Sequence, residues 1–205
     1  MAIVRRTASL LGVLLLCLAG ANTCRWGERS RALGAEDYAV YSALLQSQLA
    51  FMGSSARPRA FVSTTQDCSP IGEECFRDWD STVGPVALVR EANDNYRARC
   101  GHPRPIERFP GLPGNWPLVR WSQLDSAYSA PYDTSRWLPL RRTYPELSGY
   151  TGVSCVGFSR DGKYAIVHGF SYSGFLTGGD GWWLLSRHGS GWEVVRPICP
   201  SRFHS

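Results

Sequence analysis

The segment between Gly169 and His188 comes closest in this sequence to a catalytic pattern. Ser171 follows Gly169 by two residues, as in the Gly-x-Ser-x-Gly elbow of serine hydrolases, and Asp180 and His188 come later. That elbow requires glycine at its fifth position and a helix directly after the serine. Ser173 occupies the fifth position here, and a glycine-rich run and another predicted strand follow it. We therefore expect Ser171 to lie in an ordinary β-strand and predict no catalytic residue from this segment.

The histidines and acidic residues form no pattern that predicts a metal site. No two histidines have the H-x-x-x-H spacing of a zinc-binding helix, and no two cysteines have the C-x-x-C spacing. The acidic residues around position 78 carry oxygen ligands suited to calcium, but they lack the EF-hand spacing, so we expect a solvated acidic loop. Hydrolysis of a glycan needs two carboxylates about 5 to 10 Å apart, and the sequence selects no such pair. We predict no metal and no cofactor.

Aromatic residues crowd the proline-containing stretch between residues 116 and 144. Flat rings with a polar edge suit contacts with sugars or peptides, and exposed aromatic clusters often mark binding surfaces. The same rings also fit the core packing of a loop-rich segment, which is the commoner outcome. The residues predicted to contact a glycan or peptide are Trp116, Trp121, Tyr128, Tyr132, Trp137 and Tyr144.

The first 21 residues predict a secretory signal peptide. Two arginines precede a short apolar run, and Ala19 and Ala21 place small residues where a signal peptidase needs them. The apolar run is shorter than the ~20 residues that a membrane-spanning helix needs. Lipid anchoring at Cys24 is the alternative, but the residues before this cysteine fit a lipobox poorly. We expect an exported mature chain, residues 22–205, without a membrane span.

Six cysteines follow the predicted signal peptide and predict a disulfide-bonded protein. An even count in an exported chain argues for disulfides because compartments outside the cytosol are oxidising, although six cysteines allow about 15 connectivities. The clearest pairing joins Cys68 to Cys75, because Pro70 and Gly72 let the segment between them turn back. The other expected pairs are Cys155 with Cys199 and Cys24 with Cys100.

Two helices are predicted in the first half of the mature chain. Residues 35–49 carry apolar and aromatic side chains at helical spacing, with Glu36 and Asp37 in the first turn, where the helix dipole favours acids. Residues 86–99 form the second helix, which ends before Gly101. The remaining expectations are a strand at 60–64, a loop at 101–116, a strand at 117–121 and a short helix at 135–142.

The last third of the chain predicts an antiparallel β-meander, with strands at 152–158, 164–172, 182–187 and 192–196. Short connections favour antiparallel neighbours because a parallel crossover needs a dozen or more residues. A long loop is expected from residue 173 to 181. We predict one α+β domain, helical and loop-rich over 22–150 and a meander over 151–197, with the two main helices covering one face.

A set of C-terminal residues resembles the pattern of a group of small exported bacterial proteins of no assigned activity. The matching residues are Tyr144-Pro145, Gly149, Val156-Gly157-Phe158, Asp161-Gly162, Ala165, Val167, Gly179, Gly181 to Leu185 and Trp192. The resemblance covers residues 137 to 197 and implies an exported α+β protein with no assigned catalytic residue. The chain departs from the pattern at Ser159, where asparagine is usual, at Cys155, where arginine is common, and in a glycine-rich loop without the cysteine pair of many members.

The net charge argues against nucleic-acid binding. The formal charge falls from +5 to +3 without the first 21 residues, which hold two arginines and no acid, and this remainder is too small and scattered for a nucleic-acid surface. We predict an exported, disulfide-stabilised protein with a non-catalytic binding or structural role in the cell envelope or outside the cell. The alternative is a hydrolase of an envelope polymer with a carboxylate or histidine site.

The mature chain should begin at Asn22, because Ala19 and Ala21 satisfy the peptidase while the residues before Cys24 do not form a lipobox. Intact-mass measurement of the secreted protein tests this start. A diacylglyceryl mass on Cys24 would instead establish lipid anchoring.

Overall fold

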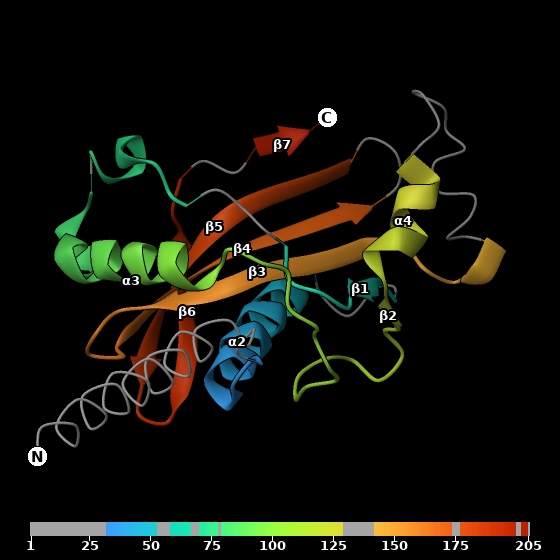
Figure 1. The fold of residues 1–205 in the computed structure, drawn as a ribbon, viewed down its shortest axis with the longest axis horizontal. Helices are drawn as coiled ribbons and strands as arrows, with labels where there is room; N and C mark the ends of the chain where they lie inside the picture. The colour runs from blue at the N-terminus through green and yellow to red at the C-terminus, as the bar shows by residue number, and fades with distance from the viewer. Residues whose placement is uncertain are drawn as a thin grey trace, which may run out of the picture. The chain divides into compact units, whose positions relative to one another are not determined.

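A mixed β-sheet runs through the part of the chain that the structure describes (Figure 1). The structure is a computed structural model, and it describes residues 32–52, 58–66, 70–77, 79–128, 142–173, 177–199 and 202–204. The strand order is β2–β1–β3–β4–β5–β6, and β7 pairs with β5. The strands are β1 (Ala60–Val62), β2 (Leu118–Val119), β3 (Tyr150–Phe158), β4 (Tyr164–Ser173), β5 (Thr177–His188), β6 (Gly191–Pro197) and β7 (Arg202–His204). The helices are α2 (Ala35–Met52), α3 (Val86–Arg99), α4 (Trp121–Tyr128) and the 3-10 turns η2 (Glu73–Phe76) and η3 (Ser81–Val83).

Strands β3 to β6 form the predicted antiparallel meander, and the α+β class is confirmed. β3 pairs with β4, β4 with β5, and β5 with β6. The first and last of these turns use Gly162 and Gly189 at φ 69° and 60°, which residues with a side chain rarely adopt. The helix α3 has the predicted bounds, and α2 begins at the predicted residue and runs three residues further.

The glycine-rich run at 178–181 belongs to β5, whereas a loop was expected there. β5 begins at Thr177 and pairs with β4 as far as Ser173. The Tyr172 ring lies over Gly178, where an added Cβ would be 2.8 Å from Tyr172 Cε1. This ring supplies the cross-strand packing that glycine lacks, so the strand continues through the glycines.

Two short parallel strands extend the sheet beyond β3. β1 pairs in parallel with both β3 and β2. β1 confirms the predicted strand at 60–64 in a shorter form, and β2 lies inside the predicted strand at 117–121. The sheet is therefore mixed, with the antiparallel meander on one side of β3 and a parallel edge on the other.

The helix α4 was not predicted, because residue 121 was assigned to a strand. The Arg120 N–H donates to Gln123 Oε1 at 2.7 Å, which is one half of a capping box. That spacing of a glutamine three residues after the cap was the local indication of a helix start. The predicted helix at 135–142 lies outside the described residues apart from Arg142.

The helices α2 and α3 pack on opposite faces of the meander, whereas both were expected on one face. In β4, Ala165 belongs to the core on the α2 side, and its neighbour Ile166 belongs to the core on the α3 side. In β5, Leu185 and Leu184 divide in the same way. Because both faces are covered, the central strands are apolar on both sides and lack a regular polar alternation.

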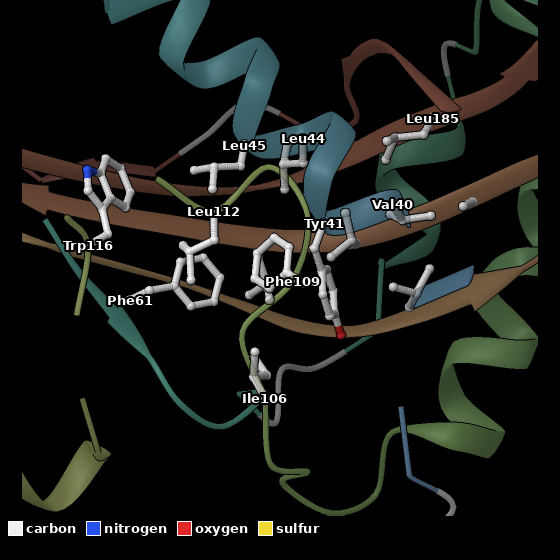
Figure 2. Packing of buried hydrophobic residues seen from close by; sticks show 14 residues of the cluster. Val40, Tyr41, Leu44, Leu45, Phe61, Ile106, Phe109, Leu112, Trp116 and Leu185 are labelled. Carbon is white, nitrogen blue, oxygen red and sulfur yellow. The ribbon is translucent and has the colours of Figure 1, made fainter. Parts of the chain in front are cut away.

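The core on the α2 side also takes in the loop that follows α3 (Figure 2). Tyr41 and Leu44 of α2 are nearly fully buried, and Phe109, Leu112 and Trp116 of the loop pack into the same cluster. The Phe61 and Phe109 ring centroids lie 5.4 Å apart and meet edge to face. The loop is thus ordered by core packing rather than by secondary structure.

Side chains of α3 bond the edge of β3 beyond the point where β1 ends. β1 pairs with β3 only at the first two residues of β3. Further along, Glu91 Oε2 accepts from Arg160 N–H at 3.2 Å, Asn95 Oδ1 accepts from Phe158 N–H at 3.0 Å, and Arg99 Nη1 donates to Val156 O at 2.9 Å. Four helical residues rise about 6 Å and two strand residues about 6.7 Å, so the two spacings nearly match. The helix therefore satisfies an edge that would otherwise be open to another strand.

Gly157 lets α3 approach β3 closely. An added Cβ would lie 2.7 Å from Tyr96 Cβ and would also contact the Ala92 carbonyl oxygen. Real Cβ atoms do not tolerate such contacts, so the helix would have to move away from the strand. This close approach lets the Asn95 and Arg99 side chains reach the backbone of β3.

Two disulfides join segments far apart in the sequence and correct the predicted pairing. Cys75 bonds Cys199, and Cys100 bonds Cys155, with Cα separations of 5.3 and 5.7 Å. The predicted pairs Cys68–Cys75, Cys155–Cys199 and Cys24–Cys100 are therefore wrong, while Cys24 and Cys68 themselves lie outside the described residues. Nearness in sequence was a poor guide because packing of α3 on β3 brings the helix end beside the middle of that strand.

We expect Asn95→Ala to lower the free energy of unfolding by about 1 kcal/mol, because the Phe158 N–H loses its acceptor. Asn95→Asp keeps an acceptor oxygen and should recover most of that loss. Asp94→Ala is the matched control at an exposed position of the same helix and should stay within about 0.5 kcal/mol of wild type. Urea denaturation measures all three, and equal effects at positions 94 and 95 would contradict the edge contact.

Candidate functional site

The described residues enclose a groove of about 520 Å³ between α2, the loop at 108–110 and the start of β6. Small-ligand sites commonly measure about 300 to 1,000 Å³. We name it the α2 groove. Its lining residues are Ala35, Tyr38, Ala39, Ser42, Ala43, Gln46, Arg108, Phe109, Pro110, Gly191 and Trp192.

A row of small residues on α2 creates the hollow. One row of the helix is buried against the sheet, whereas Ala35, Ala39 and Ala43 repeat every four residues on the adjoining row. Their methyl groups leave space that larger side chains would fill. Ser42 Oγ donates to the Pro110 carbonyl oxygen, which holds the loop wall beside the helix.

Trp192 forms one wall and is fixed by three contacts. Its indole Nε1–H donates to Glu36 Oε2 at 3.1 Å. The Arg187 guanidinium lies over the ring at 4.8 Å from its centroid and also pairs with Glu36. The Phe158 ring packs beside it at a centroid distance of 5.7 Å. The indole is therefore held in one orientation before any ligand arrives.

Tyr38 and Arg108 hold the opposite wall. Tyr38 Oη accepts a backbone N–H of the loop at 3.1 Å, and its ring stacks on Phe109 with centroids 5.8 Å apart. Arg108 donates to the backbone carbonyls of Pro113 at 3.1 Å and Trp116 at 2.7 Å. Both walls of the α2 groove are thus built from aromatic rings held by hydrogen bonds.

The chemistry of the α2 groove suits recognition rather than proton transfer. Its lining residues include no Asp, Glu, His, Cys or Lys. Besides the Tyr38 hydroxyl and the Trp192 indole N–H, the lining offers a hydroxyl, a carboxamide and a guanidinium, from Ser42, Gln46 and Arg108. Such a lining binds and orients a ligand, but it supplies no general base.

A second polar group of residues, the His168 cluster, lies on the face of the meander opposite α2. It consists of His168 and Tyr172 in β4 and Asp180 in β5. His168 Nε2 lies 3.8 Å from Asp180 Oδ1, and the Tyr172 hydroxyl donates to Asp180 Oδ2 at 3.4 Å. The His168 ring also meets the Trp182 ring edge to face, with centroids 5.3 Å apart.

Burial controls the charge of His168. Desolvation lowers the pKa of His168 below its ordinary value of 6.5, and the Asp180 carboxylate opposes this shift only in part. The imidazole is therefore neutral at pH 7. The His168 side chain is 13% exposed and the Asp180 side chain 28%, so solvent reaches both. A neutral imidazole beside a carboxylate is able to accept a proton.

Ser171 does not join Asp180 and His188 in a triad. It pairs with Gly179 in the β4–β5 ladder, and its Oγ accepts from Arg59 Nη1 at 2.7 Å. Because side chains alternate along a strand, Ser171 lies on the face of the sheet opposite Asp180. His188 is eight residues beyond Asp180 in the same strand, about 26 Å away. The prediction that Ser171 lies in an ordinary strand is confirmed.

The structure places three of the six aromatic residues predicted to contact a ligand. Trp116 is 2% exposed and packs in the core on the α2 side, so its ring is not presented to a ligand. Trp121 and Tyr144 are half-buried against the cluster around Tyr150 and Phe170. The Tyr128 side chain and residues Tyr132 and Trp137 lie outside the described part of the chain. Ligand contact by the others stays a prediction.

Sequence reasoning did not find the α2 groove. Tyr38 falls in the predicted helix at 35–49 and Trp192 in the predicted strand at 192–196, and neither was predicted to contact a ligand. The one local indication that Trp192 could line a surface was its position near the start of a strand, just after the hairpin turn at Gly189. The alanine row on α2 acquires meaning only when the loop at 108–110 lies beside it.

Two further observations bear on chemistry. Within the described residues, no group of three or more His, Cys, Asp or Glu side chains is arranged to hold a metal ion. No helix in those same ranges is both long and apolar enough to cross a bilayer.

Comparisons with known proteins leave the geometry as the guide to function. Protein-family models, curated proteins and solved structures all gave no match to this chain. The resemblance of residues 137–197 to small exported bacterial proteins therefore stays a prediction.

We expect the protein to lose stability as the pH falls below about 6.5, because the unfolded chain then binds a proton that buried His168 takes up only at lower pH. Above that pH His168 is neutral in both the folded and the unfolded chain, so its contribution to the free energy of unfolding no longer changes. The change in the free energy of unfolding that this one histidine causes cannot exceed about 1.4 kcal/mol per pH unit. Urea denaturation from pH 8 to pH 5 measures it, because this range extends about 1.5 units on either side of the ordinary histidine pKa.

The matched variants are His168→Gln and His188→Gln. The first should flatten the pH dependence, whereas the second, at a side chain 69% exposed, should leave it unchanged. An unaltered slope in His168→Gln would show that other groups carry the pH dependence.

Proposed function

We propose that this chain is an exported, disulfide-stabilised binding protein whose ligand site is the α2 groove. The lining residues of the groove offer aromatic rings and hydrogen-bonding groups without an acid–base residue. Two disulfides support the export part of the proposal, because such bonds persist in oxidising compartments. The predicted signal peptide at 1–21 supports it independently.

The fixation of Trp192 is the observation that carries the binding proposal. Glu36, Arg187 and Phe158 all contact its indole ring. A side chain that is ordered beforehand loses little conformational entropy when a ligand binds, so more of the contact energy appears as affinity. A ring needed only for packing would not require a hydrogen bond, a cation and a second ring at the surface.

The shape and polar groups of the groove favour a glycan as its ligand. The lining residues of α2 run from Ala35 to Gln46, which is about 16 Å along the helix. A sugar chain of a few units fills that length, places its flat apolar faces on the Tyr38 and Trp192 rings, and offers hydroxyls to Gln46 and Arg108. A short extended peptide fits the same length and is the alternative that the experiment must separate.

A hydrolase of an envelope polymer is the second candidate function, and the His168 cluster is the observation that favours it. Asp180 lies beside a neutral imidazole, as an orienting carboxylate does beside a general base. This candidate places the chemistry on the opposite face of the sheet from the α2 groove. Activity on a glycan that is abolished by His168→Gln but survives blocking of the groove would support it.

The binding proposal is tested by filling the groove. Ala43→Trp places an indole in the hollow, while Ser47→Trp adds the same bulk one helical turn further along, where the residue is exposed and does not line the groove. The probes are soluble oligosaccharides of N-acetylglucosamine and of glucose, with a pool of short peptides beside them. The indole N–H resonance of Trp192 reports binding, because that proton is bonded to Glu36.

We expect an oligosaccharide to shift the Trp192 resonance, Ala43→Trp to weaken its affinity at least about tenfold, and Ser47→Trp to leave it within about twofold. Shifts with the peptides alone would replace the glycan with a peptide as the ligand class. Equal affinities in the two tryptophan variants would remove the α2 groove as the site.

A further inference from the structure

We propose that the Cys75–Cys199 disulfide is a redox-labile clasp, which a dithiol opens in the folded protein while Cys100–Cys155 stays closed. In this exchange the two thiols of the reductant are oxidised to a disulfide, and Cys75 and Cys199 are reduced to thiols. The inference concerns neither the α2 groove nor its ligand, so it stands or falls separately from the proposed function.

The two disulfides differ in their access to solvent. Cys100 and Cys155 are 5% and 1% exposed and belong to the core cluster under α3. Cys75 and Cys199 are both partly exposed. A thiolate must reach a sulfur atom to attack it, so exposure decides which bond exchanges first. The clasp is therefore open to a dithiol that the buried bond excludes.

On one side, the clasp holds a short element with little stability of its own. Cys75 lies in η2, a single 3-10 turn in which Glu73 and Glu74 are exposed and Phe76 is buried. The Cys75 N–H donates to Gly72 O at 3.2 Å. Isolated turns of this length are marginal in water, so η2 depends on its attachments.

On the other side, the disulfide holds a turn in which Cys199 has an unfavourable backbone conformation. Cys199 has φ 75°, in the left-handed region that residues with a side chain rarely adopt. The chain continues from this turn to β7, which pairs with β5 only from Gly178 to Asp180. Opening the bond would let the backbone of Cys199 relax, and a three-residue strand would then hold the C-terminal segment alone.

Contacts with the core limit how much of the chain is released when the disulfide opens. The buried Asn93 side chain accepts from Ile71 N–H at 2.9 Å and donates to Ile71 O at 3.0 Å. On the other side, the Ile198 N–H donates to Trp182 O at 2.7 Å, and Ile198 is 1% exposed. Ile71 precedes η2 and Ile198 precedes Cys199 in the chain, so both anchors lie outside the released segments, and reduction frees η2 and β7 while the meander stays folded.

Opening the clasp would expose a sheet edge next to the His168 cluster. β7 pairs with the same stretch of β5 that contains Asp180. Without β7, the backbone groups of β5 on that side lose their strand partner and become available to another extended segment. The redox state of Cys75 and Cys199 would thus control access to the edge of β5.

The test treats the folded full chain with graded dithiothreitol, traps free thiols by alkylation and maps them by peptide mass. We expect Cys75 and Cys199 to be alkylated at least about tenfold faster than Cys100 and Cys155. Amide exchange on the selectively reduced protein should rise about tenfold or more in residues 72–77 and in β7, and should stay unchanged in β3 and β4.

The variant pair Cys75→Ser with Cys199→Ser should reproduce that exchange pattern without reductant, whereas Cys100→Ser with Cys155→Ser should leave β7 protected. Reduction of both bonds at one rate, or unchanged exchange in β7 after reduction, would overturn the proposal. A Cys68–Cys75 link in the untreated protein would overturn it as well. The measurements on reduced wild type decide the question even if a variant does not fold.

Discussion

The ion pair between Arg99 and Asp37 joins elements from opposite faces of the sheet, and the rest of the structure depends on it. Arg99 Nη2 lies 3.1 Å from Asp37 Oδ1, and the Asp37 side chain is 3% exposed. Asp37 Oδ2 also accepts from Gly34 N–H at 2.8 Å, at the start of α2, while Arg99 Nη1 bonds the edge of β3. A carboxylate this deeply buried requires its cation, so α2 and α3 cannot move independently.

The same arginine is connected to the α2 groove through a chain of side-chain contacts. Its guanidinium lies 5.2 Å from the Phe158 ring centroid, and Phe158 packs against Trp192. Trp192 in turn contacts Arg187 and Glu36, and Glu36 neighbours Asp37 at the start of α2. The contacts thus connect Arg99, through two aromatic rings and two acidic residues, back to itself. A wall of the groove is rigid because it belongs to the same set of contacts that holds the helices on the sheet.

The two faces of the meander carry different side chains, because successive residues of a strand point to opposite faces of the sheet. In β4, His168 lies on the α3 side, while Gly169 lies on the α2 side, with Leu44 Cδ2 3.2 Å from where its Cβ would be. On the α2 side apolar residues of the strands pack against α2, and the groove forms outside the sheet, along the helix. The α3 side admits a histidine and an acid because the helix there ends before it covers the far half of β4 and β5.

Local sequence determined the elements, and tertiary structure decided how they meet. The bounds of α3 and the strand order of the meander followed from helical spacing and from turn residues, because these depend on neighbours within a few positions. The disulfide partners of Cys75 and Cys100, the opposite placement of α2 and α3, and the hydrogen bond from Trp192 to Glu36 depend on residues more than 50 positions apart. No local sequence pattern encodes such contacts. A cysteine or an aromatic ring has similar near neighbours in many different folds, and only the packing of the whole core selects its distant partner.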